Sequence, residues 1–281
     1  VRGGREVSGM RLDELVAAAA PALGTVTLDD AAARTEVTAI THDSRSVRPG
    51  AIFCCVSGAH HDGHRFARAA VDAGAVALLC ERPTHVGVPE IVVRDVRYAM
   101  AHLAAALHGN PSHALRVVGV TGTNGKTTTV HLTASILRAA GTPTSVIGTL
   151  TGARTTPEST DLQALLAEKR DAGDQAVVLE VSSHALVQHR VEAVRFAAVA
   201  FTNLTRDHLD YHRSMEEYFK AKASLFTSHF APIAVIDTDG PYGRLLASTS
   251  DVPTIVRTGL SHVEGLEGGA ASSRVRWRGV G

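Results

Sequence analysis

The sequence has no excess of charge of either sign, because 28 lysines and arginines balance 28 aspartates and glutamates. Proteins that bind the nucleic-acid backbone usually carry a basic excess, so nucleic acid is not expected as a partner. No apolar run approaches the roughly 18 residues that a membrane-spanning helix needs, and no internal repeat is found. What is left is a globular chain of 281 residues, 44% hydrophobic, that can bury one or two cores.

Cysteine is scarce, and its placement excludes two kinds of site. Cys54, Cys55 and Cys80 are an odd number without the spacing of zinc ligands. A disulfide framework and a zinc site are therefore not expected. All three lie in apolar, strand-like runs, which predicts buried free thiols in a reducing cytoplasm.

A stretch near the start, Leu15–Leu23 behind Met10-Arg11, loosely resembles a secretory signal. Asp13 and Glu14 stand where such a signal carries only positive charge, and alanine makes the run weakly apolar. These features favour the alternative, a short amphipathic helix preceded by a loose leader. We therefore expect a cytoplasmic protein.

The first hundred residues or so alternate strand and helix patterns. The triplet Gly109-Asn110-Pro111 stops this series and is the expected boundary between domains at 1–111 and 112–281. Strands are expected at Ala51–Val56, Ala75–Cys80 and Glu90–Val93, and helices at Arg65–Ala73 and Val96–Leu107.

A second series follows the boundary. Continuous apolar strands that alternate with helices predict an α/β fold with a mostly parallel sheet covered on both faces. After Gly259 the chain is rich in glycine, with one weak strand at Ser273–Arg278. The other strands are expected at Arg116–Val120, Ser145–Ile147, Ala176–Val181, Phe196–Phe201 and Ile233–Ile236, and the helices at Lys126–Ala140, Leu162–Ala172 and Ser214–Phe226.

The clearest motif is the glycine-rich turn at residues 122–128, which follows a strand and opens a helix. Glycines let backbone N–H groups converge on phosphate oxygens, and the helix adds its positive end. Lys126 would reach the outer phosphates and Thr127 would ligate Mg²⁺. The strict pattern places glycine at position 120, where this chain has Val120. An ordinary glycine turn is the alternative, but the flanking strand and helix favour an ATP site.

Two other strand ends carry polar chemistry. Ligands of open parallel sheets bind beyond the carboxyl ends of the strands. Glu180 ends an apolar strand, where burying a carboxylate is costly without a cation such as the Mg²⁺ of ATP. The alternative is a glutamate at the surface edge. Residues 202–212 follow another strand and contain Asp207, His208, Asp210 and His212, which are either metal ligands or solvated loop residues.

The helix after this loop places a lysine among apolar residues. At 100° per residue, Lys222 lies within the stripe formed by Met215, Tyr218, Phe219, Leu225 and Phe226, whereas Lys220 faces the other way. Such a lysine either reaches out to water or is desolvated, which favours a neutral amine. A neutral amine can take up carbon dioxide and become a carbamate. The pattern alone favours the lysine that reaches water.

Four separated segments, in order, resemble the Mur ligase family and within it the MurE branch, which adds the third amino acid to UDP-N-acetylmuramoyl-L-alanyl-D-glutamate. The segments are residues 41–53, 119–128, 180–190 and 201–212, and the resemblance runs from about residue 38 to about 245. It implies a small N-terminal UDP-sugar-binding domain and a central ATPase domain of the P-loop type. The implied reaction is phosphoryl transfer from ATP to the substrate carboxylate, followed by attack of an amine on the acyl phosphate.

The resemblance also implies roles for matching residues. Arg154 stands where some members have asparagine, so no contact is implied there. UDP and the sugar would contact His42, Ser44, Ala59, His60 and His61; the muramoyl peptide would contact Thr155, Thr156, Ser182, Gln188 and Arg190. ATP would be held by Gly122, Thr123, Asn124, Gly125, Lys126, Thr127 and Thr128. Magnesium would be held by Thr127, Glu180 and His208 with Lys222, the lysine that is carbamylated in this family. Catalysis would depend on Lys126, Glu180, His208 and Lys222.

The family's third domain, with its Asp-Asn-Pro-Arg motif, finds no match in the sequence. We therefore expect a truncated ligase, monomeric, that uses ATP, Mg²⁺, the UDP-muramoyl dipeptide and either meso-diaminopimelate or lysine. One alternative is a non-catalytic binding module, or half of a split enzyme that needs a separate C-terminal chain. Another is a different member of the superfamily, such as MurF or folylpolyglutamate synthase. Residues 41–53 argue against the folate enzyme, and residues 182–190 argue against MurF.

Overall fold

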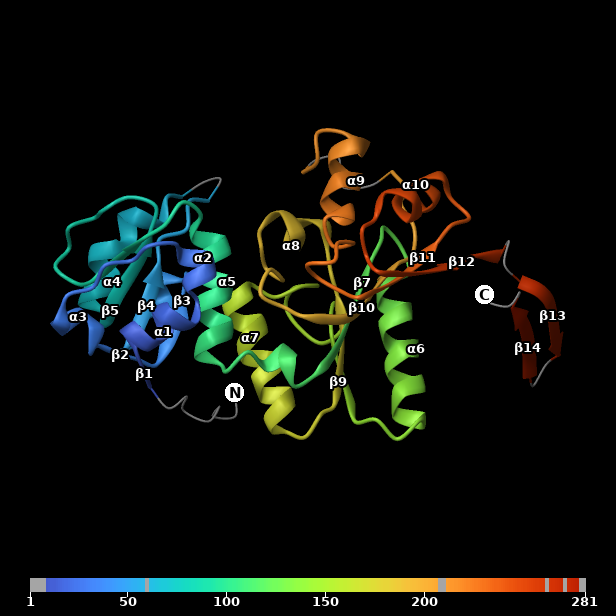
Figure 1. Cartoon of the computed structure of the whole chain (residues 1–281), viewed down its shortest axis with the longest axis horizontal. Coiled ribbons are helices and arrows are strands. Elements are labelled where there is room, and N and C mark those ends of the chain that lie inside the picture. Colours follow the sequence, from blue (N-terminus) through green and yellow to red (C-terminus); the bar gives the residue numbers. More distant parts are fainter. Residues whose placement is uncertain (1–8, 59–60, 207–210, 261–262, 270–271, 278–281) are drawn as a thin grey trace. The chain divides into compact units, whose positions relative to one another are not determined.

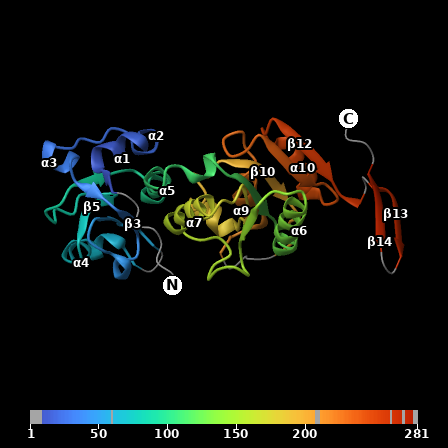
Figure 2. The ribbon, with the colours of Figure 1, turned by 90° about the horizontal axis from the view of Figure 1, so that it is seen from below.

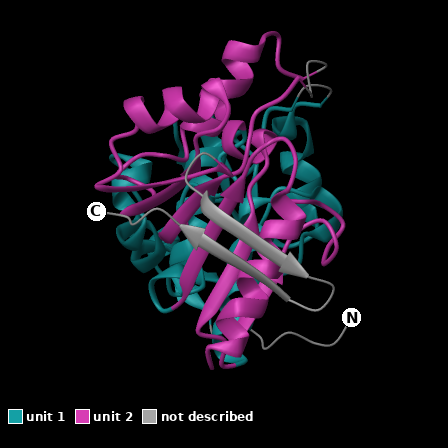
Figure 3. Ribbon diagram, turned by 90° about the vertical axis from the view of Figure 1, so that its right-hand side faces the viewer, with its two compact units in different colours: residues 1–114, 157–172, 188–193 teal, residues 115–156, 173–187, 194–281 magenta. Residues whose placement is uncertain are grey.

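The computed structural model describes residues 9–58, 61–206, 211–260, 263–269 and 272–277 (Figure 1). The chain divides into two compact units (Figure 3). Unit 1 comprises residues 1–114, 157–172 and 188–193, and unit 2 comprises residues 115–156, 173–187 and 194–281. The first break follows Ala114, shortly after the expected boundary, but two later segments group with unit 1. The α/β class with parallel sheets is confirmed.

Unit 1 is built on a parallel sheet of four strands, in the order β3 (Ala39–Thr41), β4 (Ala51–Cys54), β5 (Ala75–Cys80) and β6 (Glu90–Val92). A short antiparallel pair, β1 (Met10–Arg11) and β2 (Glu36–Val37), lies outside this sheet. The helices are α1 (Leu12–Ala18), α2 (Ala20–Leu23), α3 (Asp30–Ala33), α4 (Ala67–Asp72), α5 (Val96–Leu107) and α7 (Ser159–Asp171).

Alternating side chains of the unit 1 sheet fill two cores. Ile52 and Cys54 pack with α1, α2 and α5 on one face, whereas Phe53, Cys55 and Cys80 pack with α4 on the other. All three cysteines are buried and free, as expected. Burial raises the pKa of the Cys55 thiol to about 12 and that of Cys80 to about 11, so both are unreactive near neutral pH.

Helices α1 and α2 account for the stretch that resembled a secretory signal. Leu12, Leu15 and Leu23 are buried in the core of unit 1. An amphipathic element built into the fold is therefore the correct interpretation. Among the described residues, no helix is long and apolar enough to cross a membrane.

Helix α5 has the bounds that the sequence predicts. Asp95 caps it by accepting a hydrogen bond from the amide of Tyr98 at 2.9 Å. Gly109 and Asn110 then adopt left-handed φ values of 69° and 49°, which end the helix. Helix α7 lies beside α5 in both ribbon views (Figure 1, Figure 2).

Unit 2 is built on a parallel sheet of six strands in the order β12-β11-β10-β7-β9-β8. All the carboxyl ends therefore share one edge, and β7 lies between two strands that follow it in sequence. The strands are β7 (Arg116–Thr121), β8 (Thr144–Ile147), β9 (Ala176–Glu180), β10 (Phe196–Phe201), β11 (Ile233–Asp237) and β12 (Thr254–Thr258). The helices are α6 (Lys126–Ala139), α8 (Ser183–Val187), α9 (Met215–Ala223) and α10 (Pro241–Thr249).

Several expected elements need correction. The helix expected at Arg65–Ala73 is a 3-10 turn, Gly63–Phe66, followed by the shorter α4, because Asp62 caps the turn. The helix expected at Ser214–Phe226 ends at Ala223, with Ser214 as its cap. The glycine-rich stretch holds two antiparallel strands instead of one, β13 (Val263–Gly269) and β14 (Ser272–Trp277). The sequence did not predict α10 or β12.

Candidate active site

The glycine-rich turn lies between β7 and α6, at the shared carboxyl edge of the unit 2 sheet. Gly122 has a φ of 150°, and a Cβ there would meet the Thr202 hydroxyl oxygen at 1.9 Å, so only glycine fits. Gly125 has a φ of 85° and precedes α6. Val120 is fully buried within β7. The departure from the strict motif is therefore harmless, because position 120 still belongs to the strand.

The turn is fastened to the segment that follows β10. The Thr123 amide donates to the Asn203 carbonyl at 2.9 Å, and the Asn124 amide donates to Asn203 Oδ1 at 3.0 Å. Thr202 donates from its hydroxyl to the Asn124 carbonyl at 2.6 Å. Thr205 exchanges two hydrogen bonds with the Thr123 hydroxyl, at 3.0 and 3.2 Å. These contacts fix the shape of the turn at the first turn of α6, whose residues, Lys126–Thr129, include no acidic side chain.

Two lysine amines meet at one carbonyl of the turn. Lys126 Nζ donates to the carbonyl oxygens of Gly122 and Thr123, both at 2.9 Å, and Lys222 Nζ donates to that of Gly122 at 2.9 Å. Lys222 is only 1% exposed, and its nitrogen lies 4.6 Å from the centre of the Tyr218 ring. The interpretation favoured by the helical pattern alone, that Lys222 reaches water, is wrong, because its amine is buried against the glycine-rich turn. Lys220 is exposed, as predicted.

Glu180 ends β9 beside the same turn and is fully buried. Its carboxylate accepts hydrogen bonds from the Thr127 hydroxyl at 3.0 Å, the Thr149 amide at 2.9 Å and the Thr149 hydroxyl at 3.3 Å. A surface-edge position for Glu180 is therefore excluded. The sequence argument missed Thr149, which no motif marks. It directly follows Gly148, where a Cβ would lie 2.2 Å from Glu180 Oε1, so the chain after β8 passes close to this carboxylate.

The environment of Glu180 suits a divalent cation. In the part of the chain that the structure describes, its partners are two hydroxyls and one amide, and none of them carries a positive charge. Mg²⁺ prefers oxygen ligands, and the Glu180 carboxylate and the Thr127 hydroxyl provide them here. No group of three or more His, Cys, Asp and Glu gathers among the described residues. The residues Asp207, His208 and Asp210, which the sequence also singled out, lie outside the described residues.

A threonine–serine contact lies next to Glu180. The Thr156 hydroxyl donates to the Glu180 carbonyl at 2.8 Å and accepts from the Ser182 amide at 3.0 Å, and it lies 3.4 Å from the Ser182 hydroxyl. Thr155 contacts the Thr149 hydroxyl at 3.0 Å. Three residues implied in peptide binding thus contact Glu180 or its neighbours: Thr156 bonds the Glu180 backbone, Ser182 bonds Thr156, and Thr155 contacts Thr149.

The remaining two residues of the implied peptide-binding set belong to unit 1. Arg190 donates to Gln188 Oε1 at 2.7 Å and forms an ion pair with Glu158 Oε1 at 2.8 Å. Glu158, at the start of α7, also pairs with Arg97 on α5 at 3.1 Å. We call Arg97, Glu158 and Arg190 the arginine–glutamate cluster. The sequence argument singled out Arg190 but neither of its two charged neighbours.

The residues implied in UDP binding follow strands of the unit 1 sheet. His42 follows β3, and Ser44 opens a 3-10 turn, Ser44–Ser46. Asp43 caps this turn; its hydrogen bonds to Arg45 lower the pKa of its carboxyl to about 2, so it stays charged at neutral pH. His61 is exposed and lies edge-on to Phe66, with ring centres 6.5 Å apart. Ala59 and His60 lie outside the described residues.

The turn that carries His61 is anchored to the end of β5. His64 Nδ1 lies 2.7 Å from Asp62 Oδ1, and the Glu81 amide donates to His64 Nε2 at 3.1 Å. Because Nε2 accepts, Nδ1 carries the proton that it shares with Asp62. Arg82 also pairs with Asp62. Hydrogen bonds from His64 and Arg82 hold the pKa of Asp62 well below its usual range.

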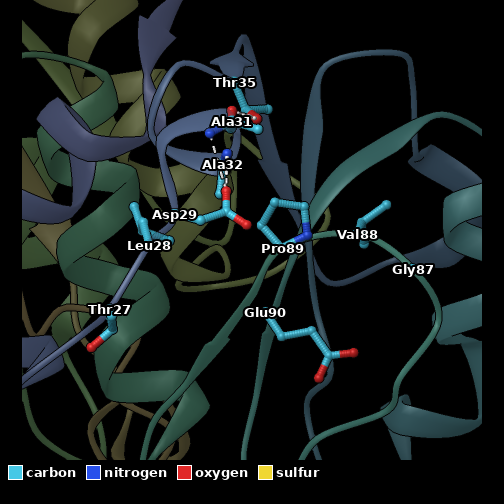
Figure 4. A pocket seen from close by; sticks show the side chains of 10 residues that line it. All are labelled: Thr27, Leu28, Asp29, Ala31, Ala32, Thr35, Gly87, Val88, Pro89 and Glu90. Carbon is cyan, nitrogen blue, oxygen red and sulfur yellow. Dashed lines mark hydrogen bonds between the residues drawn. The ribbon is translucent and has the colours of Figure 1, made fainter.

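A polar cavity of about 430 Å³ lies at the amino end of β6 (Figure 4). Its carboxylates are already engaged: Asp29 caps α3, and Glu90 accepts from the amide and hydroxyl of Thr84 at 2.9 and 2.7 Å. None of the residues singled out from the sequence lines it. Its lining residues are Thr27, Leu28, Asp29, Ala31, Ala32, Thr35, Gly87, Val88, Pro89 and Glu90.

Known proteins match both parts of the chain. The Mur ligase middle domain matches residues 120–268, and the description "Mur ligase family, catalytic domain" matches residues 36–109. A UDP-N-acetylmuramoyl-L-alanyl-D-glutamate--2,6-diaminopimelate ligase of Geobacter metallireducens is 47% identical over 244 residues, which are 80% of this chain and 48% of that protein. The enzyme of the same name from Streptomyces coelicolor is 44% identical over 241 residues, 81% of this chain and 47% of that one.

A solved structure of a UDP-N-acetylmuramoyl-L-alanyl-D-glutamate--2,6-diaminopimelate ligase also matches, with a TM-score of 0.80 at 28% identity, over 95% of this chain and 57% of that one. A MurF structure from Acinetobacter baumannii, with a TM-score of 0.65 at 21% identity, shares the fold. The chain spans about half the length of the curated relatives it matches. The phosphate turn, the buried lysine and the buried glutamate thus stand within matched sequence, and the chain belongs to the Mur ligase family.

Proposed function

We propose that this chain is the nucleotide-binding and UDP-sugar-binding part of an ATP-dependent ligase of peptidoglycan precursor synthesis. The ligase would add a third amino acid to UDP-N-acetylmuramoyl-L-alanyl-D-glutamate. The observation that supports this most directly is the meeting of Lys126, Lys222, Thr127 and Glu180 around one phosphate turn. The names of the relatives point to the same reaction and favour 2,6-diaminopimelate over lysine as the amino acid.

The reaction joins a carboxylate and an amine in two steps. A carboxylate oxygen of the muramoyl dipeptide attacks the γ-phosphorus of ATP, ADP leaves, and an acyl phosphate forms. The amine of the third amino acid attacks the acyl carbon, inorganic phosphate leaves, and the nitrogen loses a proton. Such phosphoryl transfer depends on positioning and on neutralising charge. The backbone amides at residues 125–128 and the ammonium of Lys126 would provide both.

The residues at the carboxyl edge fit a magnesium ion that accompanies ATP. Thr127 and Glu180 would hold it, with His208 as the third ligand implied by the family resemblance. When bound, Mg²⁺ neutralises the negative charge of the phosphates. Thr149 fixes both oxygens of Glu180 through its amide and hydroxyl, so it would orient the carboxylate toward the metal.

Lys222 is proposed to carry a carbamate. Its amine shares the Gly122 carbonyl with Lys126, and two ammonium groups so close together repel each other. A neutral Lys222 amine that attacks carbon dioxide and loses a proton replaces the second positive charge with an anionic oxygen ligand. A ¹³C resonance of carbamate, seen after incubation with ¹³C-bicarbonate and absent from Lys222→Ala, would support this. Its absence from the parent chain would exclude it.

The unit 1 residues would hold the UDP-muramoyl peptide. His42, Ser44 and the turn at residues 59–61 are proposed to contact UDP and the sugar. Gln188 and Arg190 of unit 1, and Thr155, Thr156 and Ser182 of unit 2, are proposed to contact the peptide. Calorimetry with the UDP-muramoyl dipeptide tests these residues separately from the ATP site, with Ser44→Ala and Arg190→Ala as the variants.

The function is tested by ADP release that depends on the UDP-muramoyl dipeptide and meso-diaminopimelate. The chain is assayed alone and with the separately produced C-terminal half of the Geobacter metallireducens ligase. We expect the chain alone to bind ATP, and release to appear when that half is added and to vanish in Lys126→Ala. A chain that binds no ATP contradicts the proposal. Tight binding of the UDP-muramoyl dipeptide with no turnover in either arm would favour a non-catalytic binding module.

A further inference from the structure

The arginine–glutamate cluster of unit 1 surrounds a residue of the proposed peptide site. Glu158 is 5% exposed, and each of its carboxylate oxygens faces a different guanidinium. Oε1 lies 2.8 Å from Arg190 Nη2, and Oε2 lies 3.1 Å from Arg97 Nη1. The Arg190 side chain is 12% exposed. Close charge-assisted bonds in such a buried place hold a side chain in one orientation.

Glu158 does not cap the helix that it precedes. It occupies the cap position before α7, yet its side chain makes no capping hydrogen bond. A glutamate used only to start a helix would turn its carboxylate toward the first amides of that helix. Here the carboxylate is directed to residues 61 positions earlier and 32 positions later in the chain. Two contacts of its carboxylate are therefore with arginines of other segments, and none is a cap of α7.

The segment around Arg190 is fixed on other sides as well. Arg190 Nη2 also donates to Gln188 Oε1 at 2.7 Å. His189 adopts a left-handed φ of 53° and places Nδ1 2.8 Å from Glu192 and Nε2 3.5 Å from Asp95. Gln163 of α7 donates to the Ala193 carbonyl at 3.3 Å. The guanidinium of Arg190 is thus oriented by side chains whose own backbone is held.

We propose that Glu158 is a positioning residue that holds the Arg190 guanidinium ready for an anionic group, carboxylate or phosphate, of the UDP-muramoyl dipeptide. This inference rests on the proposed function, because that function assigns Arg190 to the substrate. Arg190 loses little further rotamer freedom when the substrate arrives, and this preorganisation raises affinity. Glu158 itself does not touch the substrate.

The test measures binding of UDP-N-acetylmuramoyl-L-alanyl-D-glutamate to the whole chain by calorimetry. Glu158→Gln is expected to weaken binding about tenfold, the effect of losing one charge-assisted contact. Glu158→Asp, which keeps the charge but shortens the side chain, is expected to fall between the parent and Glu158→Gln. ATP affinity should not change in either variant. If Glu158→Gln is too unstable to assay, the comparison rests on Glu158→Asp.

Arg97→Gln is the matched control, because it also removes one ion pair from the cluster but leaves Glu158 on Arg190. We expect it to change substrate affinity less than twofold. Equal weakening by Arg97→Gln and Glu158→Gln would mean that only the stability of the cluster matters, and would overturn the positioning role.

A double-mutant cycle tests the substrate role of Arg190 and the positioning role of Glu158 separately. Arg190→Ala should weaken binding, and Glu158→Gln should add nothing in the Arg190→Ala background. If Arg190→Ala leaves binding intact, the substrate role of Arg190 in the proposed function fails. If Arg190→Ala weakens binding while Glu158→Gln and Glu158→Asp do not, only the positioning role fails.

Discussion

Two buried glutamates, one in each unit, are surrounded in opposite ways. Glu180 in unit 2 is fully buried and accepts hydrogen bonds from the neutral groups of Thr127 and Thr149. Glu158 in unit 1 is 5% exposed and lies between two arginines. A buried carboxylate needs a positive partner or a network of donors. The negative charge of Glu158 is balanced by arginines of the protein. Glu180 is held by neutral hydrogen-bond donors, so its charge can still be balanced by a bound cation.

This difference indicates what each glutamate is for. A carboxylate already paired with arginines gains little from a metal and acts mainly on the orientation of its partners. A carboxylate held by hydroxyls and an amide has its geometry fixed but its charge uncompensated among the described residues. The second arrangement suits a site that meets Mg²⁺ together with ATP.

The largest expected effect comes from Glu180→Gln. Removing the negative charge should lower the affinity for ATP in the presence of Mg²⁺ by roughly 100-fold, the upper end of the effect seen for groups that support a bound metal. The free energy of unfolding in EDTA should not fall, because a buried uncompensated charge is removed. Calorimetry with and without Mg²⁺, together with urea unfolding, tests both parts. Parent-like affinity for Mg²⁺-ATP would refute a metal role for Glu180.

Glu158→Gln should have the opposite pattern. The change strands two guanidiniums, so the free energy of unfolding should drop by about 2–3 kcal/mol, less than for fully buried pairs because Arg97 reaches solvent. ATP affinity should stay within about twofold of the parent. Urea unfolding followed by circular dichroism measures the first and calorimetry the second. If both glutamine variants lose the same stability, the contrast between the two sites is wrong.

The sequence located the part of the proposed ATP site whose signals are local. The strand–turn–helix pattern located Gly122, Lys126 and Thr127, and the apolar run before Glu180 predicted a strand end next to them. The helical stripe placed Lys222 among apolar residues. The pattern alone favoured an amine that reaches water, which was wrong, because the carbonyl that accepts this amine is 100 residues away in the chain. Periodicity gives the face of a helix but not what that face meets.

Partners that are far apart in sequence escaped the same reasoning. Glu158 and Arg97 are 61 residues apart, and Glu180 and Thr149 are 31 apart. Neither Glu158 nor Thr149 stands in a pattern that marks it. The elements α10 and β12 were missed because their local sequence does not favour them. Helix α10 contains Gly243, which is needed because a Cβ there would lie 1.8 Å from the Asp237 carbonyl, and strand β12 is half polar. Packing overrides local propensity in both.

A smaller effect is expected from Tyr218→Phe, which tests how far neutral hydrogen bonds shape the unit 2 site. The Tyr218 hydroxyl lies 3.2 Å from the Thr123 hydroxyl, which the phosphate turn contributes. Its loss should weaken ATP binding about fivefold, equivalent to about 1 kcal/mol. Tyr218→Phe keeps the aromatic ring beside Lys222. Tyr218→Leu removes it and should weaken ATP binding further. An unchanged ATP affinity in Tyr218→Phe would show that the turn needs no support from the Tyr218 hydroxyl.

The smallest effect concerns charge near the arginine–glutamate cluster. The hydrogen bond to Glu192, outweighing burial, raises the pKa of His189 above 6.5. The folded state therefore holds this proton to higher pH than the unfolded state does. The stabilisation is complete below pH 6.5 and is lost as pH rises through the folded pKa. Unfolding free energies measured upward from pH 6.5 should fall less steeply in His189→Gln.

His108 provides a control of opposite sign within the same unit. Burial lowers the pKa of His108, so its contribution is present above pH 6.5 and is lost as pH falls through the folded pKa. His108→Gln should therefore flatten the acid side of the stability profile and leave the side above pH 6.5 unchanged. Parent-like slopes in His189→Gln above pH 6.5 would show that the carboxylates of Asp95 and Glu192 do not hold charge on His189. The charge beside Arg190 would then be more negative than the ion pairs of His189 with Asp95 and Glu192 indicate.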